Sequence, residues 1–170
     1  MAAVADVRLL GRVMYRRILV PVEHSPYDAV ILGHVRQLAL LCHSSLVLVH
    51  VADGFAARNA HQLGLRESEE MQRDREYLDD LAAALCGEGF EAEAVLAAGD
   101  PATEISQVAQ AEGCDLIAMS THGHRFLADL VLGSVANEVR HRSTVPVLLV
   151  RGTPRGTAAH APAPGAGSAT

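Results

Sequence analysis

The chain has 170 residues, a net charge of −6, 49% apolar residues, only 4% aromatic residues and no Trp. This length fits one domain whose core is built from Val, Leu, Ile and Ala, as expected for parallel strands covered by helices. The acidic balance argues against binding nucleic acid through a broad basic surface, and no apolar run reaches the roughly 18 residues that would span a bilayer.

The basic and sulfur-containing residues narrow the chemistry further. All 14 basic residues are Arg, so the chain offers no Lys for a P-loop or a Schiff base. Any phosphate would be held by backbone N–H groups, hydroxyls, Arg or a metal ion. The three cysteines, Cys42, Cys86 and Cys114, lie far apart in apolar segments, which predicts buried thiols in a reducing compartment. Because the start also lacks the pattern of a signal peptide, we expect a cytoplasmic protein.

Apolar periodicity predicts strands that alternate with helices along the chain. The predicted strands cover residues 17–22, 46–51, 91–98, 115–119 and 145–151, and the predicted helices begin at Pro26, Arg66, Pro101 and Ser134. Ser25 is expected to cap the first helix through its hydroxyl, with Pro26 at the first helical position. Such an alternation indicates a parallel sheet with right-handed crossovers.

The remaining segments set the expected limits of the domain. Residues 1–13 are expected to be an N-terminal appendage, and residues 153–170 contain too little apolar bulk to be ordered. The domain itself is expected to cover residues 14–152. Residues 52–64 lack periodicity and are expected to form a mobile flap, whereas the charged residues of the helix that follows, Asp74 among them, are expected to be solvated.

Between the fourth strand and the last helix, the sequence is suited to meet an anion. Met119 ends the strand, and residues 120–123 are expected to form a small polar turn in which Gly123 allows a close approach of backbone to ligand. Gly133 and Ser134 open the next helix, where free N–H groups and the positive end of the helix dipole favour a phosphate. Two such turns around one strand end predict a phosphate site.

The spacing of these residues is similar to a known pattern. Ser120-x-x-Gly123, nine residues and then Gly133-Ser134-Val135 resembles the nucleotide loop of the universal stress protein family, whose usual pattern is Gly-x-x-Gly, nine residues and Gly-Ser or Gly-Thr. The resemblance extends to the segments ILVPVEHS, LVLVHV and TVPVLLVR and covers about residues 14–152. It implies a doubly wound α/β fold, with a five-stranded parallel sheet in the order 3-2-1-4-5 and helices on both faces.

The resemblance also implies a binding site at the carboxyl ends of strands 1 and 4, where the strand order reverses. ATP is the implied ligand, with Mg as a possible companion. The implied adenosine side is formed by Pro21, Val22, Glu23 and Val51. The implied phosphate side is formed by Met119, Ser120, His122, Gly123, His124, Arg125, Gly133, Ser134 and Val135.

Two positions depart from the family pattern. Glu23 stands where the family usually has Asp, so a carboxylate remains for the ribose hydroxyls, one methylene further out. Ser120 replaces the first glycine and adds a Cβ where backbone passes close to a ligand, although its hydroxyl could itself donate to a phosphate. Arg125 is either a phosphate partner or an exposed Arg, and the two readings stay open.

Other chemistries have less support in the sequence. His122 and His124 form His-x-His without a Cys or carboxylate cluster at ligand spacing, which argues against a dedicated zinc site. His50 is expected to be a packed or capped histidine beside the site. No nucleophile and base stand at a recognisable spacing, so we expect no efficient enzyme, with slow ATP hydrolysis at most.

The last strand is expected to lie at a sheet edge, where an uncovered apolar strand is a pairing liability. In the resembling family this edge pairs antiparallel with its copy, which implies a homodimer through residues 145–150, from Val145 to Val150. The alternative is an edge covered by residues 1–13. We therefore expect a dimeric, ATP-binding regulator or sensor with an unknown protein partner. A scaffold of the same fold without nucleotide and a cyclic-AMP binder are the alternatives.

Overall fold

The computed structural model describes residues 14–52, 69–121 and 134–151. The elements, in chain order, are β1 (Arg17–Pro21), α1 (Asp28–Cys42), β2 (Ser45–Ala52), α3 (Glu69–Gly87), β3 (Ala92–Ala98), α4 (Pro101–Ala111), β4 (Leu116–Thr121), α5 (Ser134–Arg142) and β5 (Val147–Arg151). The expected appendage and tail, and nearly all of the expected flap, lie outside the described residues.

The strands form one parallel sheet in the order β3-β2-β1-β4-β5. This order confirms the predicted doubly wound topology. The strand order reverses at β1, because β2 and β3 are added on one side of it and β4 and β5 on the other. Strands β1 and β4 pair in parallel, through Ile18 with Leu116 and through Leu19 with Ile117. The carboxyl ends of β1 and β4 therefore flank the switch point, where parallel α/β sheets bind their ligands.

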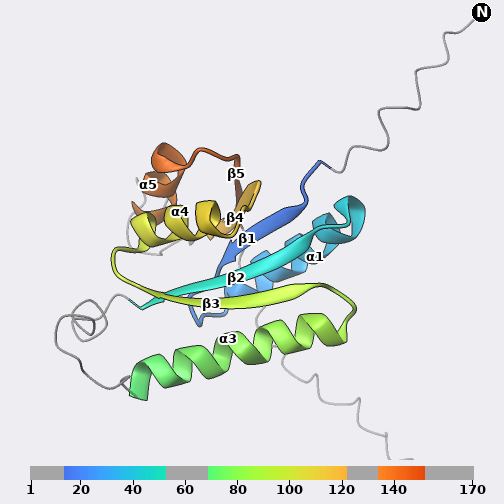
Figure 1. The fold of residues 1–170 in the computed structure, drawn as a ribbon, viewed down its shortest axis with the longest axis horizontal. Coiled ribbons are helices and arrows are strands. Elements are labelled where there is room, and N and C mark those ends of the chain that lie inside the picture. The colour runs from blue at the N-terminus through green and yellow to red at the C-terminus, as the bar shows by residue number, and fades with distance from the viewer. Residues whose placement is uncertain (1–13, 53–68, 122–133, 152–170) are drawn as a thin grey trace, which may run out of the picture.

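Helices cover both faces of the sheet, as predicted. Figure 1 shows α1 and α3 on one side and α4 and α5 on the other. Successive strand residues point to opposite faces, so neighbours in β1 enter different cores: Leu19 packs with Ile105 and Val139, and Val20 packs with Ile31 and Leu78. The middle residues of the central strands are apolar because both faces of these strands are buried.

Several predicted boundaries differ by one or two residues, including the start of β5 at Val147 instead of residue 145, and two of these differences have a structural reason. Helix α1 begins at Asp28, not at Pro26, and the residue before it, Tyr27, makes no side-chain cap. The carboxylate of Asp28 instead accepts N–H groups of the preceding loop. Strand β4 continues through Ser120 and Thr121, where a turn was expected, because these residues pair with Val150 and Arg151 of β5.

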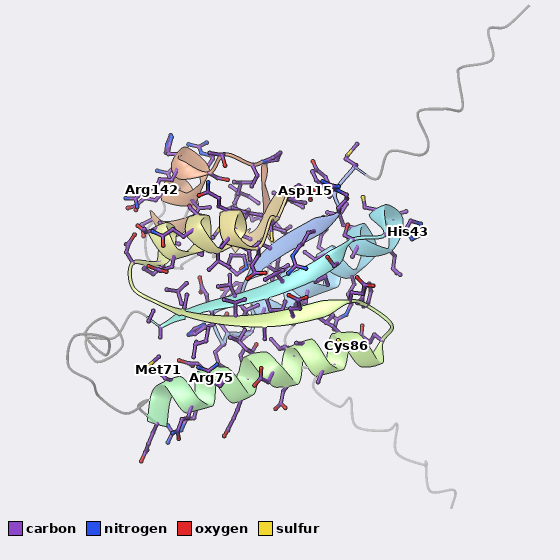
Figure 2. The ribbon with its side chains drawn as sticks, in the orientation of Figure 1. His43, Met71, Arg75, Cys86, Asp115 and Arg142 are labelled. Atoms are coloured by element: carbon purple, nitrogen blue, oxygen red, sulfur yellow. The ribbon has the colours of Figure 1, made fainter. Side chains whose placement is uncertain are left out.

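At the amino end of the sheet, Asp115 joins β4 to β1. Its carboxylate accepts hydrogen bonds from the backbone N–H groups of Arg16 and Arg17, at 3.0 and 3.1 Å. Figure 2 shows Asp115 at this edge and Cys86 near the end of α3. Cys86 is exposed, which corrects the expectation of three buried thiols, whereas Cys114 is buried.

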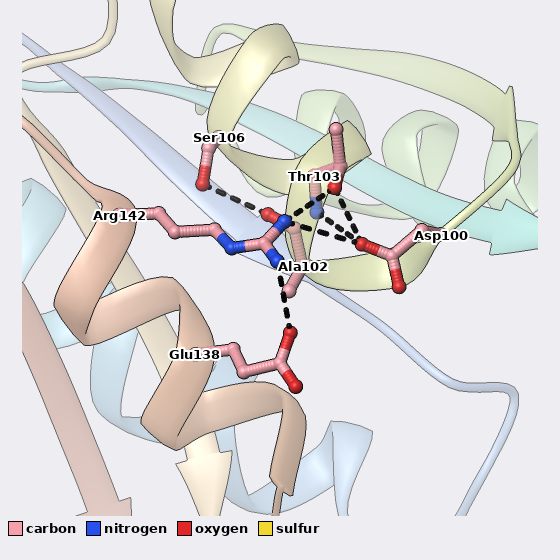
Figure 3. A network of polar contacts seen from close by, with 6 residues as sticks. All are labelled: Asp100, Ala102, Thr103, Ser106, Glu138 and Arg142. Carbon is pink, nitrogen blue, oxygen red and sulfur yellow. Dashed lines mark hydrogen bonds and ion pairs between the residues drawn. The ribbon is translucent and has the colours of Figure 1, made fainter.

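Helix α4 begins where the sequence predicts, and Arg142 links it to α5. The carboxylate of Asp100 accepts the N–H of Thr103 at 3.0 Å, and Pro101 occupies the first turn. Arg142, at the end of α5, reaches back to the Thr103 hydroxyl at 2.6 Å and to Asp100 at 3.5 Å (Figure 3). The same guanidinium pairs with Glu138 one turn earlier. These contacts fix the first turn of α4 against α5.

Candidate functional site

A cavity of about 280 Å³ lies at the carboxyl ends of β1, β2 and β4. Its walls are mostly apolar, and Glu23 supplies a carboxylate. The described residues that line it are Pro21, Val22, Glu23, Val49, His50, Val51, Pro101, Ile105, Met119 and Val135. This is the edge of the sheet at which the sequence predicts a ligand.

The folding pattern explains why these side chains converge. Val49 and Met119 pack in the core that α4 and α5 cover, and Val51 and Val135 pack against it. The cavity therefore opens between the end of the sheet and the first turns of α4 and α5. Because helices of a doubly wound fold begin at the carboxyl edge of the strands, both helix starts reach the same place.

Six of the predicted site residues line this cavity. They are Pro21, Val22, Glu23, Val51, Met119 and Val135. They come from the end of β1 and the loop after it, from β2, from β4 and from α5, so the fold brings together segments more than one hundred residues apart. Their role toward a ligand stays a prediction.

Four further lining residues were not predicted as part of the site: Val49, His50, Pro101 and Ile105. Val49 could have been found from strand alternation, since it lies two residues before Val51 on the same face. Pro101 and Ile105 are one helical turn apart and share a face of α4. The predicted helix start after β3 was the available signal for both.

The two predicted serines occupy other positions. Ser120 is paired in β4, and Met119 beside it lies on the α4 and α5 face, so strand alternation directs the Ser120 side chain toward the face of α1 and α3. Ser134 is exposed at the first residue of α5, next to Val135. Neither serine is among the described residues that line the cavity. The predicted His122, Gly123, His124, Arg125 and Gly133 lie outside the described residues.

The loop that carries Glu23 is held by its backbone. The Val22 N–H donates to the Val49 carbonyl at 2.9 Å, and the Val22 carbonyl accepts from Nδ1 of His50 at 2.9 Å. Two residues on, His24 adopts a left-handed conformation with a φ of 56°. A side chain makes this conformation unfavourable, so the surrounding contacts must stabilise it.

A buried carboxylate supplies part of that stabilisation. Asp28 is only 3% exposed. Its Oδ1 accepts the N–H of Glu23 at 3.0 Å, and its Oδ2 accepts the N–H of Ser25 at 2.9 Å and the hydroxyl of Tyr77 at 2.8 Å. Three donors thus satisfy the oxygens of this buried carboxylate. No local pattern in the sequence indicates the pairing of Asp28 with Tyr77, because it depends on tertiary structure.

Helix α3 makes a second set of contacts with the loop. The ring of His24 stacks on Tyr77 with centroids 3.9 Å apart. The Asp74 carboxylate lies 3.4 Å from Nε2 of His50 and 3.8 Å from Nδ1 of His24, and its side chain is 13% exposed. The expectation that Asp74 is solvated is therefore wrong. Since Nδ1 of His50 donates to a carbonyl, only the protonated ring can also donate to Asp74.

The ionisation of Tyr77 follows from this environment. Burial raises the pKa of the phenol, and the hydrogen bond to Asp28 and the negative charge of Asp28 raise it further. Tyr77 therefore remains a hydrogen-bond donor to Asp28 throughout the neutral range.

The described part of the chain contains neither a metal-binding cluster nor a helix that could span a membrane. Residues 14–52, 69–121 and 134–151 contain no group of three or more His, Cys, Asp or Glu arranged to hold a metal ion. None of the described helices is both long and apolar enough to cross a membrane.

Residues 14–151 match the family model described as the Universal stress protein family. The chain is 31% identical over 156 residues to the universal stress protein MJ0577 of Methanocaldococcus jannaschii, covering 82% of this chain and 96% of that protein. The solved structure of MJ0577 has a TM-score of 0.69 to this chain at 28% identity, covering 82% of this chain and 98% of that one.

Two more distant structures have the same fold. The universal stress protein of Archaeoglobus fulgidus, solved in complex with dAMP, has a TM-score of 0.60 at 24% identity and covers 80% of this chain and 98% of its own. A universal stress protein solved in complex with cAMP has a TM-score of 0.62 at 20% identity and covers 80% of this chain and 97% of its own.

Proposed function

The chain belongs to the universal stress protein family, and from that premise we propose that it binds ATP, with a divalent cation, in the cavity at the carboxyl ends of β1, β2 and β4. The observation that carries the proposal is the apolar cavity of about 280 Å³ with the Glu23 carboxylate among its lining residues. Small-molecule sites are typically apolar pockets of about 300–1,000 Å³ with a few polar groups.

The cavity suits the nucleoside part of the ligand. Val51, Met119 and Ile105 offer apolar surface to the base. The Glu23 carboxylate can accept hydrogen bonds from the ribose hydroxyls. The triphosphate would extend toward the start of α5, where Ser134 and free backbone N–H groups favour an anion. Arg125 and the glycines at positions 123 and 133 would complete the phosphate side, as the family pattern in the sequence implies.

The relatives support an adenine nucleotide. One was solved with dAMP and another with cAMP, so the fold accommodates an adenine nucleotide in those proteins. The cAMP complex keeps a cyclic nucleotide as the second candidate ligand here. Cyclic AMP needs fewer phosphate donors than ATP, and this difference makes the two ligands separable by titration.

Dimerisation through β5 is the second part of the proposal. Strand β5 lies at one edge of the sheet and pairs on one side with β4. Among the described residues no strand pairs with its other side, so its outward backbone groups can pair with a second copy, as edge strands do. A dimer whose nucleotide loops change with ligand binding would act as a regulator or sensor in the stress response. The rival is a dimeric scaffold that binds no nucleotide.

Calorimetric titration of the full chain with ATP, ADP and cyclic AMP, each with and without Mg²⁺, tests the ligand. We expect saturable ATP binding in the micromolar range, about −8 kcal/mol, that strengthens with Mg²⁺. Tighter binding of cyclic AMP than of ATP would show that cyclic AMP, and not ATP, is the ligand. If none of the three nucleotides gives binding heat or a thermal shift, the result favours a dimeric scaffold that binds no nucleotide.

The variant Gly123→Asp locates the phosphates, because it adds a carboxylate to the loop where the family pattern places them. We expect it to abolish ATP binding by charge repulsion. Gly33→Asp is the matched control. Gly33 is exposed on α1, nothing lies within 4 Å of the Cβ that it would gain, and α1 covers the opposite face of the sheet from the cavity. Equal loss in both variants would argue against a phosphate site in this loop.

A further inference from the structure

The backbone on both sides of Glu23 is held in place by a single carboxylate. Asp28 accepts the N–H of Glu23 itself and the N–H of Ser25, at 3.0 and 2.9 Å. Between these two donors, His24 has a φ of 56°. A left-handed residue between two converging N–H groups makes a concave nest that holds an anion. In this protein, the anion in the nest is the chain's own Asp28.

Tyr77 prevents Asp28 from moving out of this nest. Its hydroxyl donates to Oδ2 of Asp28 at 2.8 Å, and the ring of His24 stacks on Tyr77 from the loop side. Helix α3 therefore holds both the carboxylate and the loop residue next to Glu23. The raised pKa of the phenol keeps the hydroxyl protonated, so this donor is not lost in the neutral range.

Glu23 is exposed and lines the cavity, and its backbone N–H is held by Asp28. An exposed side chain discriminates poorly between ligands unless its backbone is held in place. The order that Asp28 gives to the loop therefore limits the positions that the Glu23 carboxylate can reach. This limit matters most for a directional contact such as a hydrogen bond.

We propose that Asp28, held by Tyr77, is a positioning residue for Glu23, and that together they make the site selective for nucleotides that carry ribose hydroxyls. This inference rests on the nucleotide site proposed above. The Glu23 carboxylate accepts a hydrogen bond from a ribose hydroxyl, and the negative charge of the carboxylate strengthens this bond. Asp28 does not touch the ligand. It acts through the N–H groups of Glu23 and Ser25.

The probe is 2′,3′-dideoxy-ATP, which keeps the base and triphosphate of ATP and lacks both ribose hydroxyls. The measured quantity is the ratio of its Kd to the Kd of ATP, by calorimetry in Mg²⁺. For the wild type we expect a ratio of about ten or more, since a hydrogen bond to a charged group contributes that much to binding. For Glu23→Ala we expect a ratio of about one, because the acceptor is gone.

Asp28→Asn tests the positioning role with little change in volume. The amide oxygen can accept one of the two backbone N–H groups, whereas the amide nitrogen cannot accept the other. We expect the ratio to fall to about three or less, chiefly through weaker ATP binding, with dideoxy-ATP within about twofold of the wild type. Tyr77→Phe removes the hydroxyl donor and should lower the ratio in the same direction, which keeps the inference testable if Asp28→Asn does not fold.

Glu88→Gln is the matched control. Glu88 makes a two-point contact with Arg36 of α1, at 2.6 and 2.8 Å, so it also joins the region of α3 to α1 through a carboxylate, away from the cavity. This variant should keep the wild-type ratio even if it is less stable. A loss of selectivity here would point to a general loosening of the fold.

The outcomes separate the inference from the proposed function. A lower ratio in Asp28→Asn and Tyr77→Phe, with the ratio kept in Glu88→Gln, supports the positioning role. Equal weakening of both nucleotides in Asp28→Asn would overturn it and make Asp28 a purely structural residue. A wild-type ratio of one with clear ATP binding would overturn the sugar contact alone. If the wild type binds neither nucleotide, the proposed function fails and the inference fails with it.

Discussion

The hydroxyl of Tyr77 donates a 2.8 Å hydrogen bond to the carboxylate of Asp28, 49 residues away in the sequence. Asp28 starts helix α1 and Tyr77 lies within α3, so this contact ties the loop after β1 to a helix on the same face of the sheet. It also provides a third donor to a carboxylate that is 3% exposed.

Removing the Tyr77 hydroxyl should destabilise the protein at neutral pH. Tyr77→Phe leaves Asp28 buried with two donors, and we expect the free energy of unfolding to fall by about 1 kcal/mol. Urea denaturation at pH 7 measures this change. An unchanged midpoint would mean that the contact contributes nothing to stability.

The same variant should change the alkaline limb of the stability profile. The folded protein raises the pKa of Tyr77 above its usual 10.0, first by burial and then through Asp28. The folded state thus holds this proton more tightly than the unfolded chain, and the resulting stability is present below pH 10 and lost as the pH rises above it. Stability should fall more steeply above pH 10 in the wild type than in Tyr77→Phe, and parallel profiles would contradict this.

The cysteines should differ in their reaction with a neutral alkylating reagent at pH 8. Cys86 is exposed, whereas Cys114 is 5% exposed and burial raises the pKa of its thiol from 9.0 to about 11. We expect Cys86 to be labelled quickly and Cys114 to stay unlabelled until urea unfolds the chain, as peptide mapping by mass spectrometry would show. Rapid labelling of Cys114 in the folded protein would refute this assignment.

The first turn of α4 should depend more on its cap than on its ion pair. Asp100→Ala removes the acceptor of the Thr103 N–H, and we expect a loss of about 1 kcal/mol in unfolding free energy. Arg142→Met removes the contacts of Figure 3 from a side chain that is 49% exposed, so its cost should stay below about 1 kcal/mol. Thermal or urea denaturation compares the two, and a larger cost for Arg142→Met would reverse the ranking.

The edge strand β5 should control the oligomeric state. The Pro146 carbonyl accepts the N–H of Ile117, and by the alternation of a parallel ladder the N–H of Leu149 points away from β4. Leu149→Pro removes this outward donor and should give a monomer in light scattering. Leu149→Ala loses similar packing but keeps the N–H, and it should remain a dimer. A dimer in both variants would place the interface elsewhere.

Apolar periodicity predicted the alternation of strands and helices because these patterns are local in sequence, whereas the strand order was implied by the family resemblance. Gly133 with Ser134 before a helical pattern likewise predicted a helix from Ser134, and α5 covers Ser134–Arg142. The cap at Asp100 was equally predictable, since Asp, Pro and Thr at this spacing form a known helix start. The strand ends at which a site was predicted line one cavity, and their role toward a ligand stays a prediction.

The parts that the sequence did not predict depend on contacts between distant residues. The pairing of Ser120 with Val150 extends β4 because a backbone partner is available there, whatever the polarity of the side chain. Asp74 was expected to be solvated, and nothing near Asp28 in the sequence points to Tyr77; only the fold brings His50 to Asp74 and Tyr77 to Asp28. No local pattern carries that information.

If a nucleotide occupies the cavity lined by Val51, filling that cavity should weaken ATP binding. Val51→Phe adds a ring where the base is expected, whereas Leu40→Phe adds one at a residue that is 67% exposed on α1 and serves as the control. Calorimetric titration with Mg²⁺ and ATP should show micromolar binding for the wild type and for Leu40→Phe, and binding at least about tenfold weaker for Val51→Phe. Equal ATP affinity in all three proteins would contradict the account and place the nucleotide outside this cavity.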